Sequence, residues 1–391
     1  MNFEIFLTAI ALTVLFSQGV ATLILLSRLL QGAMRRPPLT FKRATPDMLG
    51  KTSAIVPTLN EAARIAPCLQ GLGDQSYELR EVIVVDSNSQ DGTPEIVKAT
   101  AVKDTRFRLI NDDPLPTGWI GRPWALHTGY LYSSPQSEWI LGIDADTKPQ
   151  AGLIPSLIDT AESENYDLIS LAPQFILQYP GEWWLQPALL MTLLYRFDSA
   201  GVDAIAPERV MANGQCFFCR RSVLEKLDGY TSAASSFCDD VTLARNIARA
   251  GYKVGFLDGS QLLQVRMYEG FTETWREWGR SLDLKDAASS AQVWGDVAFL
   301  ALVQALPLPL FLITSYLVIT GNRIFTVLAL LALNLFLVLL RWGMLIAIAP
   351  SYANSSIFFW LSPFADLFAV GRIFLSSGRK PQQWRGRIYS S

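Results

Sequence analysis

Two long uncharged segments constrain this chain more than any other feature of its sequence. Ile5–Leu26 and Val297–Asn322 contain no charged residue, and each is long enough to cross a hydrocarbon core of about 30 Å. Ile324–Ala349 is nearly as apolar and is interrupted by Arg341, whereas the region from about Thr52 to Asp296 has mixed polarity. The sequence therefore predicts a globular domain held between membrane segments.

The charges around the first segment predict its orientation. Its apolar run is too long for the core of a cleaved signal peptide and has no basic region before it, so we expect a retained anchor. Glu4 precedes the run, and the basic residues Arg28, Arg35, Arg36, Lys42 and Arg43 follow it. Positive residues favour the cytoplasmic side. We therefore expect an integral, multi-pass membrane protein whose globular domain is cytoplasmic.

The C-terminal region contains a less regular apolar segment. Ile357–Phe374 carries Pro363, Asp366 and Arg372, which argue against a clean crossing. The tail residues Arg379, Lys380, Arg385 and Arg387 favour the cytoplasmic side. Two C-terminal spans followed by a re-entrant or interfacial third segment would fit both the interrupted apolar segment and a cytoplasmic tail. The expected parts are an anchor (1–30), a basic linker (31–51), a globular domain (52–270), an interfacial amphipathic segment (271–296), membrane helices (297–376) and a basic tail (377–391).

The globular region has the pattern of an α/β domain. Short apolar runs that read as strands alternate with helical stretches such as Ala62–Leu72 and Pro94–Ala101. This alternation predicts a mostly parallel sheet. The first expected strand begins at Thr52, and four further strands are expected over 81–86, 107–111, 139–144 and 167–171.

The fourth strand ends in two acids, in the sequence Trp139-Ile-Leu-Gly-Ile-Asp144-Ala-Asp146. On a strand, residues two apart face the same side. Two carboxylates on one side repel each other unless a cation lies between them, and Mg²⁺ or Mn²⁺ bridging to phosphate oxygens satisfies both. The alternative is an ordinary acidic turn after a strand.

Composition excludes some kinds of function. The net charge of the 391 residues is −2, which leaves no footprint for nucleic acid. Cys216 and Cys219 form a C-x-x-C pair, but no second pair with ligand spacing follows and the one histidine is His127. We therefore expect buried reduced thiols, as is usual in a cytoplasmic domain, and a packed or hydrogen-bonded histidine.

Three motifs in order resemble a known family. Val56-Pro57-Thr58-Leu59-Asn60-Glu61, Asp86-Ser-Asn-Ser-Gln-Asp91-Gly-Thr93 and Asp144-Ala-Asp146 are similar to those of inverting glycosyltransferases of family 2, over about Thr52–Ser281. The resemblance implies a GT-A fold, with a Rossmann-like, mostly parallel sheet. It also implies a nucleotide-sugar donor, UDP- or GDP-linked, and a divalent cation, Mg²⁺ or Mn²⁺.

Further motifs resemble the membrane-bound branch of that family that glycosylates lipids. They are the stretch Gly118–Leu126, the triplet Asn213-Gly214-Gln215 and Cys238-Asp239-Asp240-Val241. Ceramide, hopanoid-associated and carotenoid enzymes belong to this branch, and the carotenoid 2'-O-glycosyltransferases acting on myxol-type carotenoids are the most similar. The resemblance implies transfer to a hydroxyl of a membrane lipid, a carotenoid above all, with another ceramide-like or hopanoid-related lipid as the alternative.

The resemblance also implies roles for single residues. Asp240 is the expected general base, with Asp239 as the second candidate, and Asp144 and Asp146 are the expected metal ligands. The expected acceptor-binding residues are Trp119, Asn213, Gly214, Gln215, Trp183 and Trp184. The expected donor-binding residues are Pro57, Thr58, Asn60, Glu61, Asp86, Ser87, Asp91, Arg122, Asp144 and Arg280.

Several of these residues have structural alternatives. Asp91 also suits a helix N-cap, and the Asp239–Asp240 pair suits the first turn of a helix over 241–250. Gln174–Ala200, which contains both acceptor tryptophans, suits either a membrane-docked wall or a core helix. Arg280 lies in a segment that also reads as an interfacial helix.

Two departures from the family pattern bear on function. Arg122 replaces a lysine, and Ser281 replaces the tryptophan of the family's terminal motif. A processive polysaccharide synthase usually keeps that tryptophan and has more membrane spans. Ser281 and the short C-terminal membrane region therefore argue against such a synthase. A non-catalytic membrane scaffold is the remaining alternative, and the intact acids Asp86, Asp144, Asp146 and Asp240 argue against it.

Overall fold

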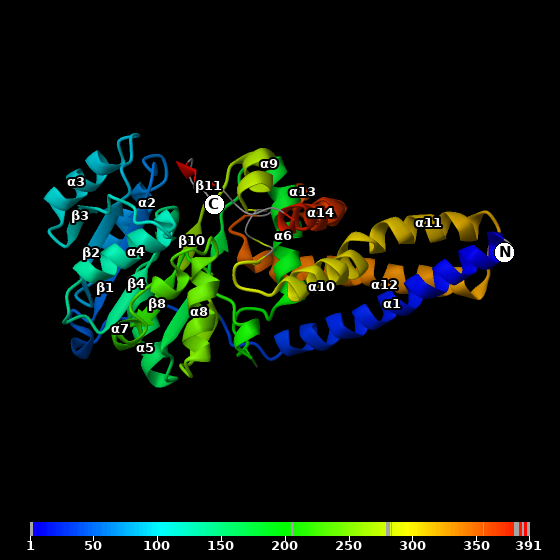
Figure 1. Cartoon of the computed structure of the whole chain (residues 1–391), viewed down its shortest axis with the longest axis horizontal. Coiled ribbons are helices and arrows are strands. Elements are labelled where there is room, and N and C mark those ends of the chain that lie inside the picture. Colours follow the sequence, from blue (N-terminus) through cyan, green and yellow to red (C-terminus); the bar gives the residue numbers. More distant parts are fainter. Residues whose placement is uncertain are drawn as a thin grey trace. The chain divides into compact units, whose positions relative to one another are not determined.

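The chain divides into two compact units, one helical and one of mixed α/β structure (Figure 1). The computed structural model describes residues 3–204, 206–278, 282, 284–354, 356–378, 383–384 and 387–388. The helical unit consists of Met1–Met34, Leu177–Asp198 and Tyr268–Lys380, and the α/β unit of Arg35–Ile176, Ser199–Met267 and Pro381–Ser391. The segment 177–198 therefore groups with the helices, whereas the sequence led us to expect one continuous globular range over 52–270.

A seven-stranded sheet forms the centre of the α/β unit, in the order β3-β2-β1-β4-β8-β6-β9. Its strands run parallel except for β8, which is antiparallel to both of its neighbours. The residues that precede β8 therefore lie at the same edge as those that follow the parallel strands. The strands are β1 (Thr52–Thr58), β2 (Leu79–Asp86), β3 (Phe107–Asn111), β4 (Trp139–Gly142), β6 (Leu168–Ala172), β8 (Phe217–Arg220) and β9 (Val254–Asp258).

Each face of this sheet carries its own hydrophobic core. Alternate residues of β1 show the division, because Ala54 and Val56 join one core and Ile55 joins the other. The first core packs against α2 (Ala66–Gly73), α3 (Thr93–Lys103) and α5 (Leu153–Ser163). The second packs against α4 (Gly121–Tyr132), α7 (Arg221–Lys226) and α8 (Asp239–Arg249). Burial of both faces explains why the predicted strands are continuous apolar runs.

The predicted strand over 139–144 is shorter in the structure. β4 ends at Gly142, so Asp144 and Asp146 lie in the turn that follows and not on the strand itself. The chain turns there because the next strand, β5 (Thr147–Pro149), joins a separate sheet with β10 (Leu263–Val265) and β7 (Gln174–Phe175). The Thr147 hydroxyl closes this turn by donating to the Asp144 carbonyl over 2.7 Å.

The helical unit contains two helices that are long and apolar enough to cross a membrane, Thr8–Gly32 and Phe325–Ser351, among the residues described. A third candidate is the pair Ser290–Ala305 and Pro307–Ile319, bent by 45°. The bend follows a π-helical turn over Ala301–Ala305 and precedes a proline, both of which disturb the helical hydrogen-bond ladder. The uncharged run over 297–322 is thus bent rather than straight, which fits either a broken span or a re-entrant loop.

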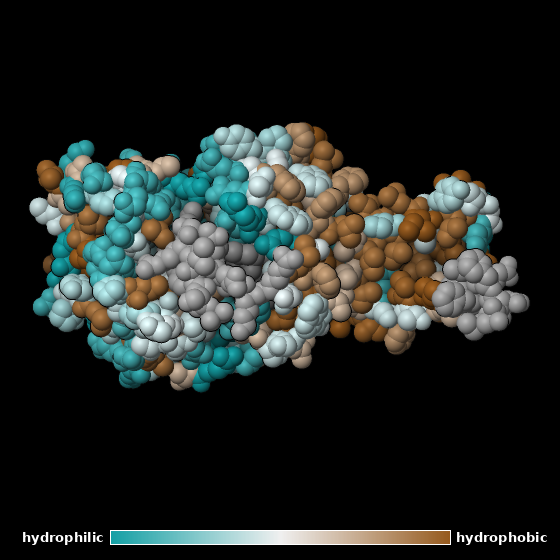
Figure 2. All heavy atoms as spheres, turned by 45° about the horizontal axis from the view of Figure 1, so that its top comes forward, coloured by the Kyte–Doolittle hydropathy of each residue, from teal (hydrophilic) through white to brown (hydrophobic). Residues whose placement is uncertain are grey.

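The other helices of this unit are mostly shorter, and α12 (Phe325–Ile348) is the long exception because it forms most of the second candidate span. They are α6 (Pro180–Arg196), α9 (Gly270–Glu273) with a π-helical turn over Thr274–Trp278, α10 (Ser290–Leu300), α11 (Pro307–Ile319), α12, α13 (Ile357–Trp360), a 3-10 turn over Ser362–Ala365 and α14 (Asp366–Ser377). The longest helix of the unit is α1 (Phe3–Gly32). The third C-terminal apolar segment consists of three pieces, α13, the 3-10 turn and α14, and its re-entrant or interfacial placement stays a prediction. Apolar side chains cover much of the surface over α1, α11 and α12 (Figure 2).

Candidate functional site

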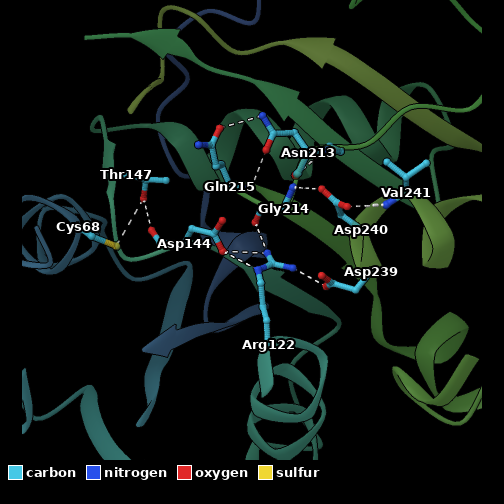
Figure 3. Close-up of polar contacts among 11 residues, drawn as sticks. Cys68, Arg122, Asp144, Thr147, Asn213, Gly214, Gln215, Asp239, Asp240 and Val241 are labelled. Atoms are coloured by element: carbon cyan, nitrogen blue, oxygen red, sulfur yellow. Dashed lines mark hydrogen bonds and ion pairs between the residues drawn. The ribbon is translucent and has the colours of Figure 1, made fainter. Parts of the chain in front are cut away.

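Four chain segments bring charged side chains and the peptide of Gly214 together at one edge of the large sheet (Figure 3). Asp144 follows β4, Gly214 precedes the oppositely directed β8, Arg122 lies in the first turn of α4, and Asp239 with Asp240 begins α8. The strand directions bring these segments together although they are far apart in the sequence. Open α/β sheets bind ligands at this edge.

Arg122 joins three of these segments. Its Nε and Nη2 atoms donate to Asp144 Oδ1 over 3.0 and 2.8 Å, and Nη2 also donates to the Gly214 carbonyl over 2.8 Å. Its Nη1 forms an ion pair with Asp239 Oδ2. The side chain of Arg122 is 13% exposed, so its guanidinium lies in a largely buried position. One side chain thus links the turn after β4, the loop before β8 and the start of α8.

Gly214 lies between Arg122 and Asp240. Its carbonyl accepts from Arg122, and its backbone N–H donates to Asp240 Oδ2 over 2.7 Å. The other carboxylate oxygen of Asp240 accepts from the Val241 N–H over 2.8 Å. A Cβ atom at position 214 would lie 2.2 Å from Arg122 Nη2, so this contact requires glycine.

The charges of this cluster do not balance, since one guanidinium faces three carboxylates. Burial raises the pKa of both Asp239 and Asp240, although Arg122 lowers it. Burial also opposes the charge on Arg122, but Asp144, Asp239 and Asp240 outweigh it and raise the pKa of the guanidinium. Arg122 therefore stays charged, and the surplus negative charge favours a further cation.

The turn after β4 has donor atoms that suit a small hard cation. Asp144 and Asp146 each present carboxylate oxygens, and the bonds from Arg122 reach Oδ1 of Asp144. The described residues include no group of three or more His, Cys, Asp or Glu side chains that could hold a metal by themselves. Mg²⁺ and Mn²⁺ commonly take one or two carboxylates and complete their shell with phosphate and water. The two acids fit an ion that binds together with a phosphate ligand.

A second polar cluster lies after β1 and β2. Asp86 is buried, and it accepts hydrogen bonds from the Thr58 hydroxyl (3.1 Å), the Ser89 hydroxyl (2.6 Å) and the Ser89 N–H (2.9 Å). The hydroxyl of Ser87 donates to Asp112 over 2.8 Å. A carboxylate has about four lone-pair sites, so Asp86 is fixed in place and still has room for a ligand donor. Pro57, predicted with this group, lies within β1.

The loop residues beside this cluster mostly hold one another. Asp91 accepts from the N–H and hydroxyl of Thr93, the first residue of α3, and from the Ala62 N–H, but the N-cap position named as its alternative is occupied by Gly92. Hydrogen bonding to Thr93 and the backbone lowers the pKa of Asp91 against the effect of burial. Asn60 accepts from the Gln90 N–H over 2.9 Å, and the N–H of Glu61 donates to Thr93 over 2.9 Å.

The predicted acceptor residues fall into three places. Asn213 and Gln215 bond each other beside Gly214, with Asn213 Nδ2 donating to Gln215 Oε1 over 2.9 Å. Trp119 packs against His127, with ring centroids 5.0 Å apart, in the α/β unit. Trp183 and Trp184 lie on α6 in the helical unit, so the structure does not place them in one body with Asn213. Arg280 and Ser281 lie outside the described residues.

The structure confirms the predictions of a packed, hydrogen-bonded histidine and of buried, reduced cysteines. His127 is buried, accepts from the Tyr230 N–H over 3.3 Å, and has a pKa lowered by burial. All four cysteines are buried and free. Cys216 and Cys219 belong to the cores on opposite faces of the sheet, so their thiols point apart and cannot share one ion.

Sequence reasoning missed Ser170, which supports the loop before β8. Its hydroxyl accepts from the Asn213 N–H over 2.7 Å and donates to the Asn213 carbonyl over 3.0 Å. Its signal was a lone hydroxyl in the apolar strand Leu168–Ala172. A buried hydroxyl in such a run needs a partner, and the partner is the motif loop.

Two glycosyltransferase family models match parts of this chain. Residues 53–228 match the family model described as glycosyl transferase family 2, and residues 202–391 match that of glycosyl transferase family 21. A 4,4'-diaponeurosporenoate glycosyltransferase of Staphylococcus haemolyticus is 27% identical over 66% of this chain and 68% of its own length. The probable glycosyltransferase YdaM of Bacillus subtilis is 25% identical over 64% of this chain, which spans 59% of that protein.

One solved structure is similar in outline. It is a mannosyltransferase from Pyrobaculum calidifontis in complex with GDP-mannose and Mn²⁺, with a TM-score of 0.47 and 19% identity. The match covers 93% of this chain and 97% of that one.

Proposed function

We propose that this chain, whose residues 53–228 match the family model described as glycosyl transferase family 2, is a glycosyltransferase with a GT-A fold that transfers a sugar from a nucleotide sugar to a hydroxyl of a membrane lipid. The observation that carries the proposal is the meeting of Asp144, Arg122, Gly214 and the Asp239–Asp240 pair at the ligand-binding edge of the sheet. This edge combines a surplus of negative charge, which favours a cation, with the partly exposed carboxylate of Asp240, which suits a proton acceptor.

The donor side of the site consists of the turn after β4 and the loops after β1 and β2. Asp144 and Asp146 would hold a divalent cation, which offsets the charge that develops on the leaving diphosphate. Asp86 is fixed by Thr58 and Ser89 and has acceptor capacity left for the N–H or O–H groups of a nucleoside. The contacts of Asp91 with Thr93 and Ala62 support a role in holding its own loop more than a donor contact.

Asp240 suits the general base better than Asp239 does. Asp239 is 5% exposed and ion-paired with Arg122, so it is already committed to a cation. Asp240 is held by two backbone N–H groups, one on each oxygen, and is more accessible. In the reaction Asp240 accepts the proton of the acceptor hydroxyl, the oxygen bonds to the anomeric carbon, and the bond to the nucleoside diphosphate breaks.

The acceptor class follows from the surroundings and from the relatives. The chain contains membrane-length apolar helices, and a carotenoid-type glycosyltransferase is among its relatives. A carotenoid is therefore the favoured class of acceptor, with a ceramide-like or hopanoid-related lipid as the second candidate. The positive residues after the first span support a cytoplasmic α/β unit.

The experiment is a transfer assay on membranes that contain the full chain. Radiolabelled UDP- and GDP-sugars are supplied with Mn²⁺ or Mg²⁺ or with a chelator, and lipids and pigments are extracted. We expect a labelled lipid that carries a single sugar and depends on the metal. Label in a high-molecular-weight polymer would support a polysaccharide synthase, and absence of label with every donor would contradict transfer.

Two variants sharpen this assay. Asp240→Asn is expected to abolish transfer while nucleotide-sugar binding survives, because the amide cannot accept the proton. Asp159→Asn is the matched control, since Asp159 is exposed on α5 and pairs with Lys42 at 3.2 Å. Turnover retained by Asp240→Asn would reject Asp240 as the base.

A further inference from the structure

Arg122 and Gly214 form a direct link between the two sides of the proposed site. Arg122 contacts the donor-side acid Asp144 and the carbonyl of Gly214 through the same nitrogen, Nη2. The N–H of Gly214 in turn holds Asp240 over 2.7 Å. These contacts form a continuous chain from the Asp144 turn, through one guanidinium and one peptide, to the carboxylate of Asp240.

A second route runs through the neighbouring acid. Arg122 Nη1 is ion-paired with Asp239, which precedes Asp240 in the first turn of α8. The same guanidinium thus fixes the loop in front of Asp240 and the helix that carries it. Every hydrogen bond of Arg122 described above ends on protein atoms of these three segments, and they occupy both its terminal nitrogens.

We propose that Arg122 is a positioning residue that couples the donor-side carboxylate Asp144 to the base Asp240, and that Gly214 is glycine so that this coupling can form. The inference rests on the proposed function, because it assigns Asp240 its role. It differs from the role expected for Arg122 from family resemblance, that of a donor ligand. The geometry supports it because a Cβ atom at Gly214 would lie 2.2 Å from Nη2 and 2.7 Å from Cζ of Arg122.

The test is a double-mutant cycle of Arg122→Lys and Gly214→Ala in the full-length membrane protein. Lysine keeps the charge but has no second nitrogen to hold Gly214 while it contacts Asp239. Misplacement of a catalytic group by about 1 Å can cost about a hundredfold in rate. We therefore expect Gly214→Ala to lower kcat about a hundredfold in the parent, and about tenfold or less in the Arg122→Lys background, where the clash is relieved.

A second readout separates positioning from donor binding. The affinity for a nucleoside diphosphate in the presence of Mn²⁺, measured by calorimetry, is expected to change by less than about twofold in Arg122→Lys. The reason is that a positioning residue does not contribute to nucleotide binding in the ground state. Arg249→Lys, on the exposed end of α8, and Gly73→Ala, which meets nothing within 4 Å, are the controls. Weaker nucleotide binding with kcat unchanged at saturation would make Arg122 a donor ligand and overturn the proposal.

The same four proteins are also compared by thermal unfolding without ligand. Gly214→Ala is expected to lower Tm more in the parent than in the Arg122→Lys background. This comparison needs no turnover, so it tests the Arg122–Gly214 link even where the parent transfers no sugar, a result that would contradict the proposed function instead. Losses that multiply in kcat and add in Tm would show that the two residues act independently and would refute the coupling.

Discussion

Replacing Asp366 with alanine removes the partner of a buried arginine inside the helical unit. Arg341 in α12 and Asp366 at the start of α14 are each 5% exposed. Arg341 Nε donates to both carboxylate oxygens over 3.2 and 2.8 Å, and its Nη2 donates to Asp366 Oδ1 over 3.0 Å. Gln304, from the π-helical turn, donates to the same carboxylate over 3.0 Å. One side chain therefore joins three segments of the unit.

The cost of this change follows from the charge left behind. Asp366→Ala is expected to lower the free energy of unfolding by about 3–5 kcal/mol, because Arg341 stays buried without a countercharge and cannot lose its proton. Arg341→Met is expected to cost less, because the remaining carboxyl can be neutralised by a proton. Arg341→Met combined with Asp366→Leu is expected to be close to the parent, since apolar residues of similar size often replace a buried ion pair at little cost.

The assay is unfolding of the purified full chain in detergent, followed by tryptophan fluorescence. Asp159→Ala serves as the control, because its exposed pair with Lys42 is expected to contribute at most about 1 kcal/mol. The decisive comparison is between Asp366→Ala and the double replacement. Equal destabilisation by both would refute the argument, because the loss could not then come from an uncompensated charge.

Three further predictions follow from the α/β unit. Gly71→Ala is expected to lower the free energy of unfolding by about 1–3 kcal/mol, because its Cβ atom would lie 2.2 Å from the Pro149 carbonyl oxygen. Gly73→Ala on the same helix is the control, because its Cβ atom would meet nothing within 4 Å, and equal effects of the two changes in a denaturant titration would contradict the prediction. Asp146→Asn is expected to weaken Mn²⁺-dependent nucleotide binding in calorimetry, because it removes a charged ligand, and unchanged binding would exclude Asp146 from the metal site. Burial raises the pKa of Asp240, and the base must be ionised to accept a proton, so kcat/KM is expected to be highest at higher pH and to fall as the pH drops through that raised pKa. A pH–rate profile in which kcat/KM falls only near the ordinary aspartate pKa of about 3.9 would argue against Asp240 as the base.

The parts of the fold with strong local signals were predictable from the sequence. β3 has the predicted bounds 107–111, and β2 contains the predicted run 81–86, because buried parallel strands are continuous apolar runs. β8 gave no such signal, since Phe217–Arg220 is short and follows a polar motif. Its place in the sheet depends on pairing with β4 and β6, which lie far away in the sequence.

The contacts of the site were beyond reach for the same reason. The motifs named Arg122, Asp144 and Asp239, but nothing local states that one guanidinium would hold both acids across 117 positions. The charged residues within the apolar segments were also visible in the sequence, but their pairing was not. Arg341 and Asp366 each read as an interruption, whereas the structure pairs them. Such pairs arise from tertiary packing, and no sequence period reports them.

The reversed direction of β8 explains why this site can form at all. In a wholly parallel sheet, the loop before a strand lies at the edge opposite to the ligand-binding loops. Because β8 runs against β4 and β6, the loop before it reaches the edge where Asp144 lies, and Gly214 can meet Arg122 there. The peptide of Gly214 then serves both sides, with its carbonyl toward Arg122 and its N–H toward Asp240. A side chain at this position would push the two sides apart, so the direction of one strand and the absence of one Cβ atom together determine whether the carboxylates share a single edge.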